Sequence, residues 1–217
     1  MLTVEVEVKG TKPLLQSKPP DAIEQGNGER TKPLIEPDAK PRAEAETKVY
    51  RAKDGACIFP STWITESLKR SGMLHKIKGA GNRRLGSLVA PAVHVLESEI
   101  PLLNDDGVPV KDFEVDHRMV RGNGGRGNPT SYRPRFDDWG AKFTLEIRDD
   151  LLPERYVHAL LVEAGDIIGW GSYRSGPFGK FRVMSWQVTR TSNGEADDRL
   201  PETVDLSVGK RSRKGAA

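Results

Sequence analysis

The sequence contains few cysteines, few aromatic residues and no long apolar run. Its single cysteine, Cys57, excludes an internal disulfide and a zinc site built from several cysteines, and it fits a reducing compartment. No apolar run approaches the roughly 18 residues that a membrane-spanning helix requires. The first ten residues, MLTVEVEVKG, alternate between apolar and polar side chains instead of forming the apolar block of a signal peptide. We therefore expect a cytoplasmic protein with no membrane partner.

The motifs of common enzyme classes are also missing. The sequence has no G-x-x-x-x-G-K-[ST] phosphate loop, no H-E-x-x-H and no G-x-S-x-G. Gly122, Gly124 and Gly127 have the spacing of a dinucleotide-binding turn, but Asn128 and Pro129 follow where that motif must open a helix. The Asp-Asp pairs at residues 105–106, 137–138 and 149–150 are typical of turns and helix caps. We expect neither a metal site nor a small-molecule cofactor.

Two polar segments interrupt or end the 217-residue chain. Residues 18–48 hold five prolines among charges of both signs, and such a segment buries too little apolar surface to offset its ordering entropy. We expect a flexible insertion there, and the alternative is an arm that orders on a neighbouring subunit or ligand. Residues 191–217, which end in a basic cluster, read as a disordered tail. One domain then covers residues 1–190.

The rest of the chain alternates predicted strands and helices. Apolar residues spaced three to four apart, opened by prolines, predict helices over residues 60–72 and 153–164. Period-two alternation and short apolar runs predict strands. These strands cover residues 3–9, 56–59, 88–96, 117–121, 142–148 and 180–189. The sequence therefore predicts an α+β fold with a split β-α-β core of the ferredoxin-like or RNA-recognition-motif (RRM) type, decorated by hairpin and loop insertions.

Positive charge is concentrated in two loops without acidic residues, although the net charge of the chain is only +3. The first loop covers residues 73–86, and the second lies within an Arg/Gly-rich insertion over residues 112–136. A cluster of like charges costs stability unless an anion compensates it, and a phosphate backbone does so. The alternative is a solvated basic face. The candidate phosphate-binding residues are Lys76, Lys78, Arg83, Arg84, Arg118, Arg121, Arg126, Arg133 and Arg135.

The most unusual stretch is GDIIGWGSYRSGPFGKFR, residues 165–182, which joins the last predicted helix to the last predicted strand. Glycine has no Cβ and lets the backbone approach a ligand closely. Aromatic and arginine side chains in the same loop offer stacking faces and phosphate partners. The simplest structural alternative, a helix C-cap at Gly165 followed by a surface turn, accounts for one of the five glycines. The candidate binding residues are Gly169, Trp170, Gly171, Tyr173, Arg174, Gly176, Gly179 and Lys180.

Basic loops interleaved with aromatic residues suit the phosphates and unpaired bases of a single strand. We therefore predict a non-enzymatic protein that binds single-stranded RNA or DNA. One alternative is a metal-independent endoribonuclease in which His75, at the head of the first basic loop, deprotonates a ribose hydroxyl. The other is a phage assembly protein in which the arm at residues 18–48 makes the subunit contacts and the charges only solubilise.

The alternating first strand, the split core and the glycine-rich loop before the last strand together resemble the repeat-associated mysterious protein (RAMP) superfamily. That family contains CRISPR backbone subunits, which coat guide RNA, and CRISPR RNA-processing ribonucleases. The run IIGWGSYRSGPFGKFRV at residues 167–183 is similar to the family's glycine-rich loop and closing strand. It is also similar to the endings of short phage-encoded proteins.

The resemblance implies how a bound strand lies on the protein. The loop glycines and Arg174 would lie against the strand, and residues 76–84 would follow its phosphates. Residues 118–135 would act as a thumb that kinks the strand and touches the next subunit. The resemblance also implies self-association along the strand, in filaments or multi-subunit complexes. No histidine here matches the catalytic histidine of the processing nucleases, which argues against cleavage.

Overall fold

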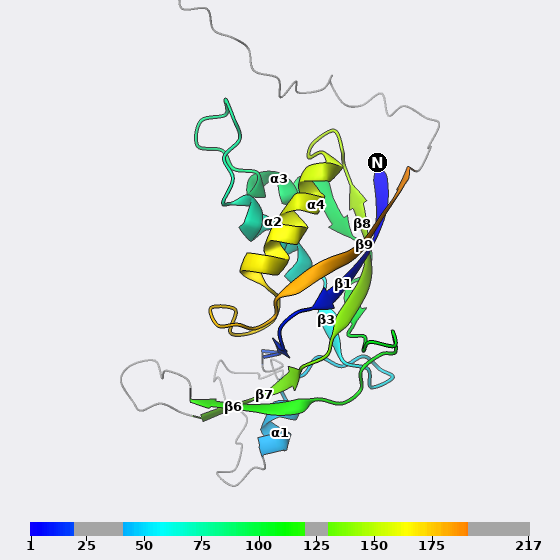
Figure 1. The fold of residues 1–217 in the computed structure, drawn as a ribbon, viewed down its shortest axis with the longest axis vertical. Helices are drawn as coiled ribbons and strands as arrows, with labels where there is room; N and C mark the ends of the chain where they lie inside the picture. The colour runs from blue at the N-terminus through cyan, green and yellow to red at the C-terminus, as the bar shows by residue number, and fades with distance from the viewer. Residues whose placement is uncertain (20–40, 120–129, 191–217) are drawn as a thin grey trace, which may run out of the picture.

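The computed structural model describes residues 1–19, 41–119 and 130–190 (Figure 1). The predictions made for residues 20–40, for the loop at 120–129 and for the tail at 191–217 lie outside these residues. Within the described part of the chain, no helix is long and apolar enough to cross a membrane.

The main sheet has four antiparallel strands in the order β4-β8-β1-β9. β1 (Leu2–Gly10) lies between β8 (Gly140–Ile147) and β9 (Phe181–Arg190), and β4 (Val93–Val95) forms the edge beyond β8. β1 and β8, the segments with the cleanest alternation, pair directly, so that the valines of β1 lie opposite apolar residues of β8. Because side chains alternate along a strand, this register sends all of the apolar ones to one face of the sheet.

Helices cover that apolar face (Figure 1). α2 (Thr62–Gly72) packs against α4 (Glu154–Glu163), and α3 (Gly86–Ala92) packs against α2. α4 continues into one π-helical turn, η1 (Ala164–Ile168). The chain passes through this layer and the sheet as β1, α2, β4 and then β8, α4, β9, which is the order of elements expected from the sequence. The α+β class is confirmed.

The core lies between the helices and the sheet. Three valines of β1 are buried there together with Leu68 of α2 and Leu161 of α4, and burial of each such side chain contributes about 1.5–3 kcal/mol. α2 and α3 approach with their backbones in contact, since a Cβ on Gly72 would lie 2.5 Å from the backbone nitrogen of Gly86. A larger residue at either glycine would separate these two helices.

A second sheet, ordered β2-β7-β6, lies at the lower end of the molecule in Figure 1. β6 (Glu114–Met119) and β7 (Thr130–Phe136) are antiparallel neighbours, and β2 (Leu14–Leu15) pairs with the end of β7. α1 (Pro41–Glu46) packs against this pair. β3 (Ile58–Pro60) and β5 (Glu99–Pro101) form a separate two-stranded sheet.

Three expectations from the sequence are wrong in detail. Residues 88–92, predicted to be strand, belong to α3, because Val89 and Ala92 lie three apart on its buried side and a short apolar run fits either structure. Residues 130–136, predicted to be loop, form β7. Residues 41–46, inside the predicted flexible insertion, form α1, which an ion pair between Arg42 and Asp112 ties to the rest of the protein.

Candidate nucleic-acid interface

The glycine-rich loop joins η1 to β9 and closes on itself and on β2. The Trp170 N–H donates to the Gly179 carbonyl at 2.9 Å, and the Ser172 N–H donates to the Leu15 carbonyl at 2.7 Å. A Cβ on Gly179 would lie 1.9 Å from the Trp170 carbonyl oxygen, and one on Gly171 would lie 2.4 Å from the Leu15 carbonyl oxygen. Both glycines also have positive φ, +68° and +77°. The packing of the loop itself therefore requires these glycines, without any ligand.

Trp170 belongs to the core, which corrects its prediction as a stacking face for bases. Its side chain is fully buried, and its ring centroid lies 4.1 Å from that of Phe181 and 5.2 Å from that of Phe59. The indole N–H donates to the Ser67 hydroxyl of α2 at 2.9 Å. Trp170 thus anchors the loop in the core, and its ring is not accessible to a ligand.

Tyr173 is the aromatic residue that the loop presents to solvent. Its side chain is 48% exposed, and its φ of +56° lies in the left-handed region, which bulky residues rarely adopt. A Cβ on Gly176 would lie 2.7 Å from the tyrosine Cε1, so glycine at that position leaves room for the ring. Backbone strain of this kind costs about 1–3 kcal/mol and is concentrated at ligand sites. We therefore identify Tyr173 as the candidate stacking face.

Arg118 connects the second sheet to this loop. Its guanidinium carbon lies 4.5 Å from the ring centroid of Phe178 and 5.7 Å from that of Tyr173. The buried carboxylate of Asp116, two residues earlier on β6, accepts from Arg118 Nε at 2.8 Å. This hydrogen bond raises the pKa of Arg118 and fixes its direction. Asp116 therefore positions a permanent cation beside the exposed tyrosine.

Arg174 and Lys180 bring two further cations to the loop. Burial and the nearby charge of Arg70 lower the pKa of Arg174, and Glu66 offsets this only in part. Burial and the charge of Arg174 likewise lower the pKa of Lys180, whose ammonium donates to the Ile167 carbonyl. Arg174 makes no hydrogen bond or ion pair with any residue that the structure describes.

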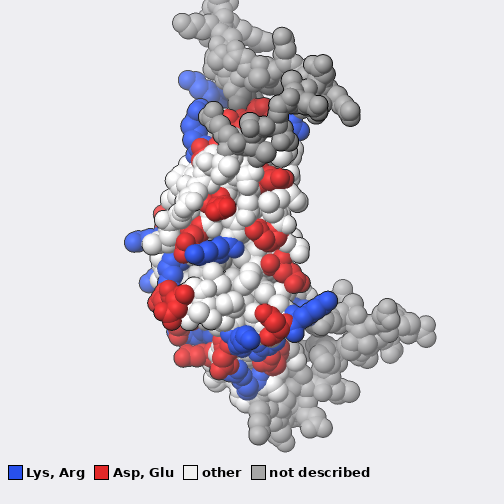
Figure 2. Space-filling view, turned by 90° about the vertical axis from the view of Figure 1, so that its right-hand side faces the viewer, with Lys and Arg blue, Asp and Glu red and all other residues white. Residues whose placement is uncertain are grey.

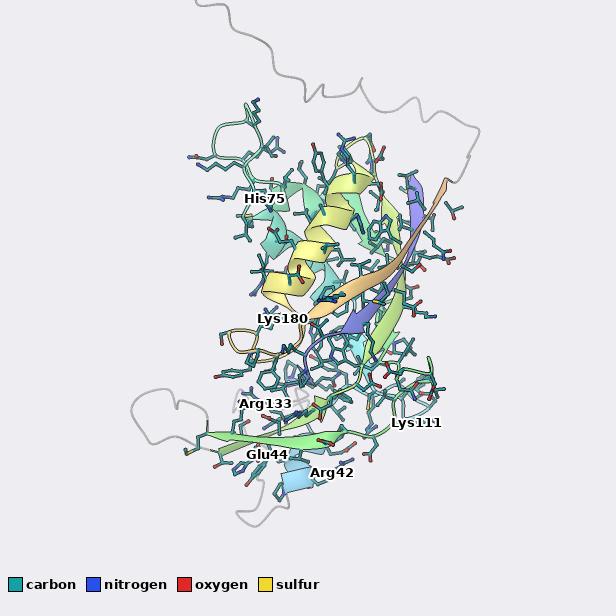
Figure 3. All side chains as sticks on the ribbon, viewed as in Figure 1. Arg42, Glu44, His75, Lys111, Arg133 and Lys180 are labelled. Carbon is teal, nitrogen blue, oxygen red and sulfur yellow. The ribbon has the colours of Figure 1, made fainter. Side chains whose placement is uncertain are left out.

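These cations come from α2, β6 and the glycine-rich loop. Arg174 interacts electrostatically with Arg70 and with Lys180, and Arg118 lies beside Tyr173, the residue before Arg174. In Figure 3 the labels of Lys180 and Arg133 lie on the side of the molecule where these cations are found. We call this group the basic stripe, and its members are Arg70, Arg118, Arg174 and Lys180.

Arg133 lies next to the basic stripe. It is the strand partner of Asp116, so its side chain projects from the same face of the second sheet as that of Arg118. Figure 3 shows it between this sheet and the glycine-rich loop. Its Nε is buried and makes no hydrogen bond within the described residues. Such a donor is costly to leave unpaired, which makes Arg133 a second candidate for an anionic partner.

The other cations predicted in the second basic loop do not join the basic stripe. Arg135 is paired with the carboxylate of Asp137 at 2.7 Å, so its charge is largely neutralised within the protein. Arg121 and Arg126 lie outside the residues that the structure describes.

The loop between α2 and α3 carries the cations of the first predicted basic loop. A single antiparallel bridge between Lys76 and Arg84 closes it into a narrow ribbon, and Arg84 donates to the Met73 carbonyl at 2.7 Å. Lys76, Lys78 and Arg83 have no side-chain partner among the described residues. The loop projects from the upper left of Figure 1, apart from the glycine-rich loop. The loop between α2 and α3 is therefore a second basic surface, separate from the glycine-rich loop.

His75 lies directly after α2, beside the end of α4. Its Nε2 is 2.8 Å from Oε2 of Glu163, and the Ser71 hydroxyl donates to the same oxygen. Burial alone would raise the pKa of Glu163, but these hydrogen bonds and the charge of His75 lower it. A carboxylate that orients an imidazole is an arrangement found in general bases. The sequence pointed to His75 and missed Glu163, because the two residues are 88 positions apart.

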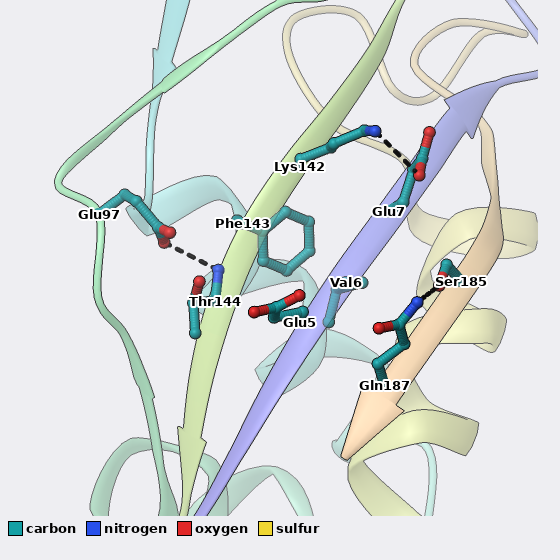
Figure 4. Close-up of a pocket in the computed structure, with 9 residues that line it drawn as sticks. All are labelled: Glu5, Val6, Glu7, Glu97, Lys142, Phe143, Thr144, Ser185 and Gln187. Carbon is teal, nitrogen blue, oxygen red and sulfur yellow. Dashed lines mark hydrogen bonds and ion pairs between the residues drawn. The ribbon is translucent and has the colours of Figure 1, made fainter. Parts of the chain in front are cut away.

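The face of the main sheet away from the helices differs from the basic stripe, because it carries charges of both signs. The side chains on it include Glu5, Glu7 and Glu97; Glu7 pairs with Lys142 at 3.3 Å, and Glu97 accepts from the Thr144 N–H at 2.9 Å (Figure 4). Figure 2 shows acidic side chains along this side of the molecule, with basic ones among them. In an RRM this face carries the aromatic residues that stack on bases. Here it carries small polar side chains and charged ones of both signs, so the binding mode of an RRM does not apply.

The fold is similar to that of a protein in a solved CRISPR assembly. The chain aligns with one from the cryo-EM structure of the Type III-B Cmr-beta bound to cognate target RNA, with a TM-score of 0.52 and 12% identity. The alignment covers 86% of this chain and 60% of that one, so this chain spans about three fifths of its length. Cmr-beta belongs to the RAMP-superfamily CRISPR proteins. The resemblance seen in the sequence is thus confirmed at the level of the fold.

Two other solved structures align less closely. Cmr6 from Pyrococcus furiosus has a TM-score of 0.43 and 12% identity, over 84% of this chain and 99% of that one. A Cas6 product complex has a TM-score of 0.29 and 15% identity, over 83% and 51%. No protein-family model matches the sequence, and no curated protein matches it.

Proposed function

We propose that this protein binds single-stranded nucleic acid, RNA in the first place, along the basic stripe. The observation that carries the proposal is Arg174, a partly buried cation without a described partner, whose pKa is lowered by burial and by Arg70. A group of this kind is stabilised by an external anion. A phosphate beside Arg174 would also reach the charge of Lys180, because the two cations influence each other.

A single strand fits the site better than a duplex does. Tyr173 offers an exposed ring beside these cations, and the bases of a duplex are stacked on each other and unavailable to it. Stacking of one base on an aromatic side chain contributes about 1–3 kcal/mol. Arg118, held above Phe178 and Tyr173, is placed to meet the phosphate that follows the stacked base.

RNA is the ligand that the fold comparison favours, because the similar Cmr-beta chain belongs to an assembly solved with cognate target RNA. We propose that this chain also works as one subunit of a ribonucleoprotein complex, and that it binds without cutting. Its single buried cysteine suits the reducing cytoplasm, where we place it.

The test is fluorescence anisotropy with a labelled single strand, RNA and DNA in parallel, over a salt titration. We expect log–log salt dependence with a slope of several units for the wild type, and Arg174→Ala should reduce this slope by about one. Lys142→Ala, which removes a cation from the open face of the main sheet, is the matched control and should leave the slope unchanged. Absence of binding at low salt, or equal losses in both variants, would refute the proposal.

The pair of His75 and Glu163 favours a second candidate function, a metal-independent endoribonuclease. In that case the imidazole takes the proton of a ribose 2′-hydroxyl while Glu163 stabilises the imidazolium. Incubation of labelled RNA with the protein in the presence of a chelator distinguishes the two functions. A nuclease cuts the RNA and His75→Ala abolishes cutting without loss of binding, whereas a binding protein leaves the RNA intact in both forms.

A further inference from the structure

The basic loop between α2 and α3 holds its shape through its own backbone. The N–H of Ile77 donates to the Arg83 carbonyl at 2.9 Å, and the N–H of Leu85 donates to the His75 carbonyl at 3.1 Å. The tip of the loop packs against nothing, since a Cβ added at Gly79 would have no atom beyond its chain neighbours within 4 Å. The direction in which the loop projects is therefore set at its base.

One side chain at this base reaches another helix. Nε2 of His75 lies 2.8 Å from Oε2 of Glu163 on α4, and the buried Ser71 of α2 donates to the same oxygen. A carboxylate only accepts hydrogen bonds, so Nε2 of His75 carries the proton of this one. Among the hydrogen bonds and ion pairs of the described residues, no other one joins a side chain of residues 73–86 to an element beyond α2 and α3.

Glu163 also stands at the root of the glycine-rich loop. It is the last residue of α4 and directly precedes η1. Within η1, the carbonyl of Ile167 accepts from Lys180 of the basic stripe. The side chain of Glu163 thus holds the base of one basic surface, while its backbone continues into the loop that carries the other.

We propose that Glu163 is a positioning residue, which fixes the loop between α2 and α3 relative to the basic stripe so that one strand contacts both surfaces. The inference rests on the proposed function, because it concerns how that nucleic acid is held. A loop already in place loses less conformational freedom on binding than one that must be ordered. Two surfaces held at a fixed separation also bind one strand more tightly than either surface does alone. The cations presented in this way are Lys76, Lys78 and Arg83.

The charge and the hydrogen bonds of Glu163 act on a bound polyanion with opposite signs. The negative charge repels phosphate, so its removal alone strengthens binding. The hydrogen bonds hold the loop, so their loss weakens binding. Gln at this position keeps an oxygen that accepts from Ser71 and His75 but carries no charge, whereas Ala keeps neither. The two substitutions therefore separate positioning from charge.

The test is fluorescence anisotropy of the full-length variants Glu163→Gln and Glu163→Ala with a labelled single-stranded RNA over a salt titration. We expect Glu163→Gln to bind at least as tightly as the wild type, with the same log–log slope. Glu163→Ala has the same net charge but should bind about fivefold or more weakly and lose about one unit of slope or more, because the loop cations no longer engage together. Glu66→Ala removes an exposed acid from α2 and is the control, which should bind at least as tightly as the wild type.

His75→Ala breaks the same hydrogen bond from the other side, so it serves as the test even if Glu163→Ala does not fold. It should weaken binding as Glu163→Ala does, whereas a nuclease that uses His75 only as a base keeps its affinity. Amide hydrogen exchange without RNA gives a second readout. Residues 75–85 should exchange faster in both Ala variants than in the wild type or in Glu163→Gln.

The outcomes separate this inference from the proposed function. Equal affinity and slope for Glu163→Gln and Glu163→Ala, or wild-type affinity in His75→Ala, would overturn the positioning role. Unchanged exchange of residues 75–85 in the Ala variants would overturn it as well. In each of these cases a reduced slope in Arg174→Ala would leave the proposed function standing. A wild-type protein that binds no RNA at low salt would refute both.

Discussion

The basic stripe carries charges of one sign and the open face of the main sheet carries both, and the two regions also differ in how their charges are paired. On the sheet face, Glu7 is paired with Lys142, and Glu97 accepts a backbone N–H. In the basic stripe, Arg118 is paired with Asp116, whereas Arg174 has no partner within the described residues and Lys180 has only a carbonyl. A surface whose charges are already paired is complete by itself, whereas clustered cations without partners indicate a missing anion.

The largest effect that we predict concerns the loop that supports the basic stripe. Gly179→Ala places a Cβ 1.9 Å from the Trp170 carbonyl oxygen at a residue with positive φ, and it should lower the free energy of unfolding by about 3 kcal/mol or more. Gly107→Ala is the control, because Gly107 has positive φ but nothing within 4 Å of its Cβ, and should cost only about 1–2 kcal/mol. Urea denaturation measures both. Equal losses would contradict the packing role of the loop glycines.

The second prediction reverses one charge in each of the two regions. Arg174→Glu should weaken binding of single-stranded RNA at least about tenfold, because it removes a phosphate partner and adds repulsion. Lys142→Glu changes the charge equally but on the open face of the main sheet, where Lys142 is already paired with Glu7, and should leave affinity within about twofold. Filter binding at fixed salt measures both. If Lys142→Glu proved the more harmful, the ligand would have to lie on the sheet face.

The third prediction separates stacking from charge. Tyr173→Asn removes the exposed ring at a position with φ of +56°, and Asn tolerates that conformation well, so the fold should be retained. Affinity for RNA should fall about fivefold or more, in line with the loss of one stacked base. Tyr156→Asn removes a similarly exposed tyrosine from α4 and should have no such effect. A salt slope that stays at the wild-type value in Tyr173→Asn would show that only stacking was lost.

The smallest predicted effect concerns pH. Hydrogen bonds from Ser71 and His75 lower the pKa of Glu163 below its ordinary value of 4.5. A carboxyl whose pKa is lowered in the folded state stabilises the protein above its unfolded pKa, and this stabilisation is lost as the pH falls through the folded value. Glu163→Gln should therefore be less stable than the wild type at neutral pH, and the two should converge in acid. Urea midpoints over a pH series measure this.

The control for the pH prediction is Glu66→Gln. Glu66 is exposed and lies 3.6 Å from Lys69, a kind of pair that contributes little to stability. Its stability curve should run parallel to that of the wild type. If Glu163→Gln also ran parallel, the hydrogen bonds from Ser71 and His75 would not stabilise the folded state.

The main sheet could be predicted from the sequence because its information is local. The alternation of residues 3–9 and 142–148 identifies two half-buried strands without knowledge of their partners. The run at residues 88–96 could not be assigned by the same reasoning, because a short apolar segment fits a helix or a strand until its neighbours are known. There the contact between Gly72 and Gly86 decides in favour of a helix.

The candidate site was predictable in its composition and not in its geometry. Arg118, Arg174 and Lys180 stood out by their residue type, but nothing local indicates that they meet. Trp170 was placed on the wrong side of the loop, because the sequence does not show which way a residue between two glycines points. Asp116 was missed, although its spacing of two from Arg118 on a strand places both side chains on one face.

The anchoring of Trp170 has a consequence for how such a loop can diverge in evolution. The ring is fixed among core aromatic residues and its N–H is bonded to Ser67, so the two ends of the loop are inherited together with the core. The stretch from Ser172 to Pro177 is tied to the interior only through its backbone, by the hydrogen bond from Ser172 to Leu15, and none of its side chains is buried. New ligand preferences can therefore arise by exchange of these six residues, while the frame that carries them remains constant.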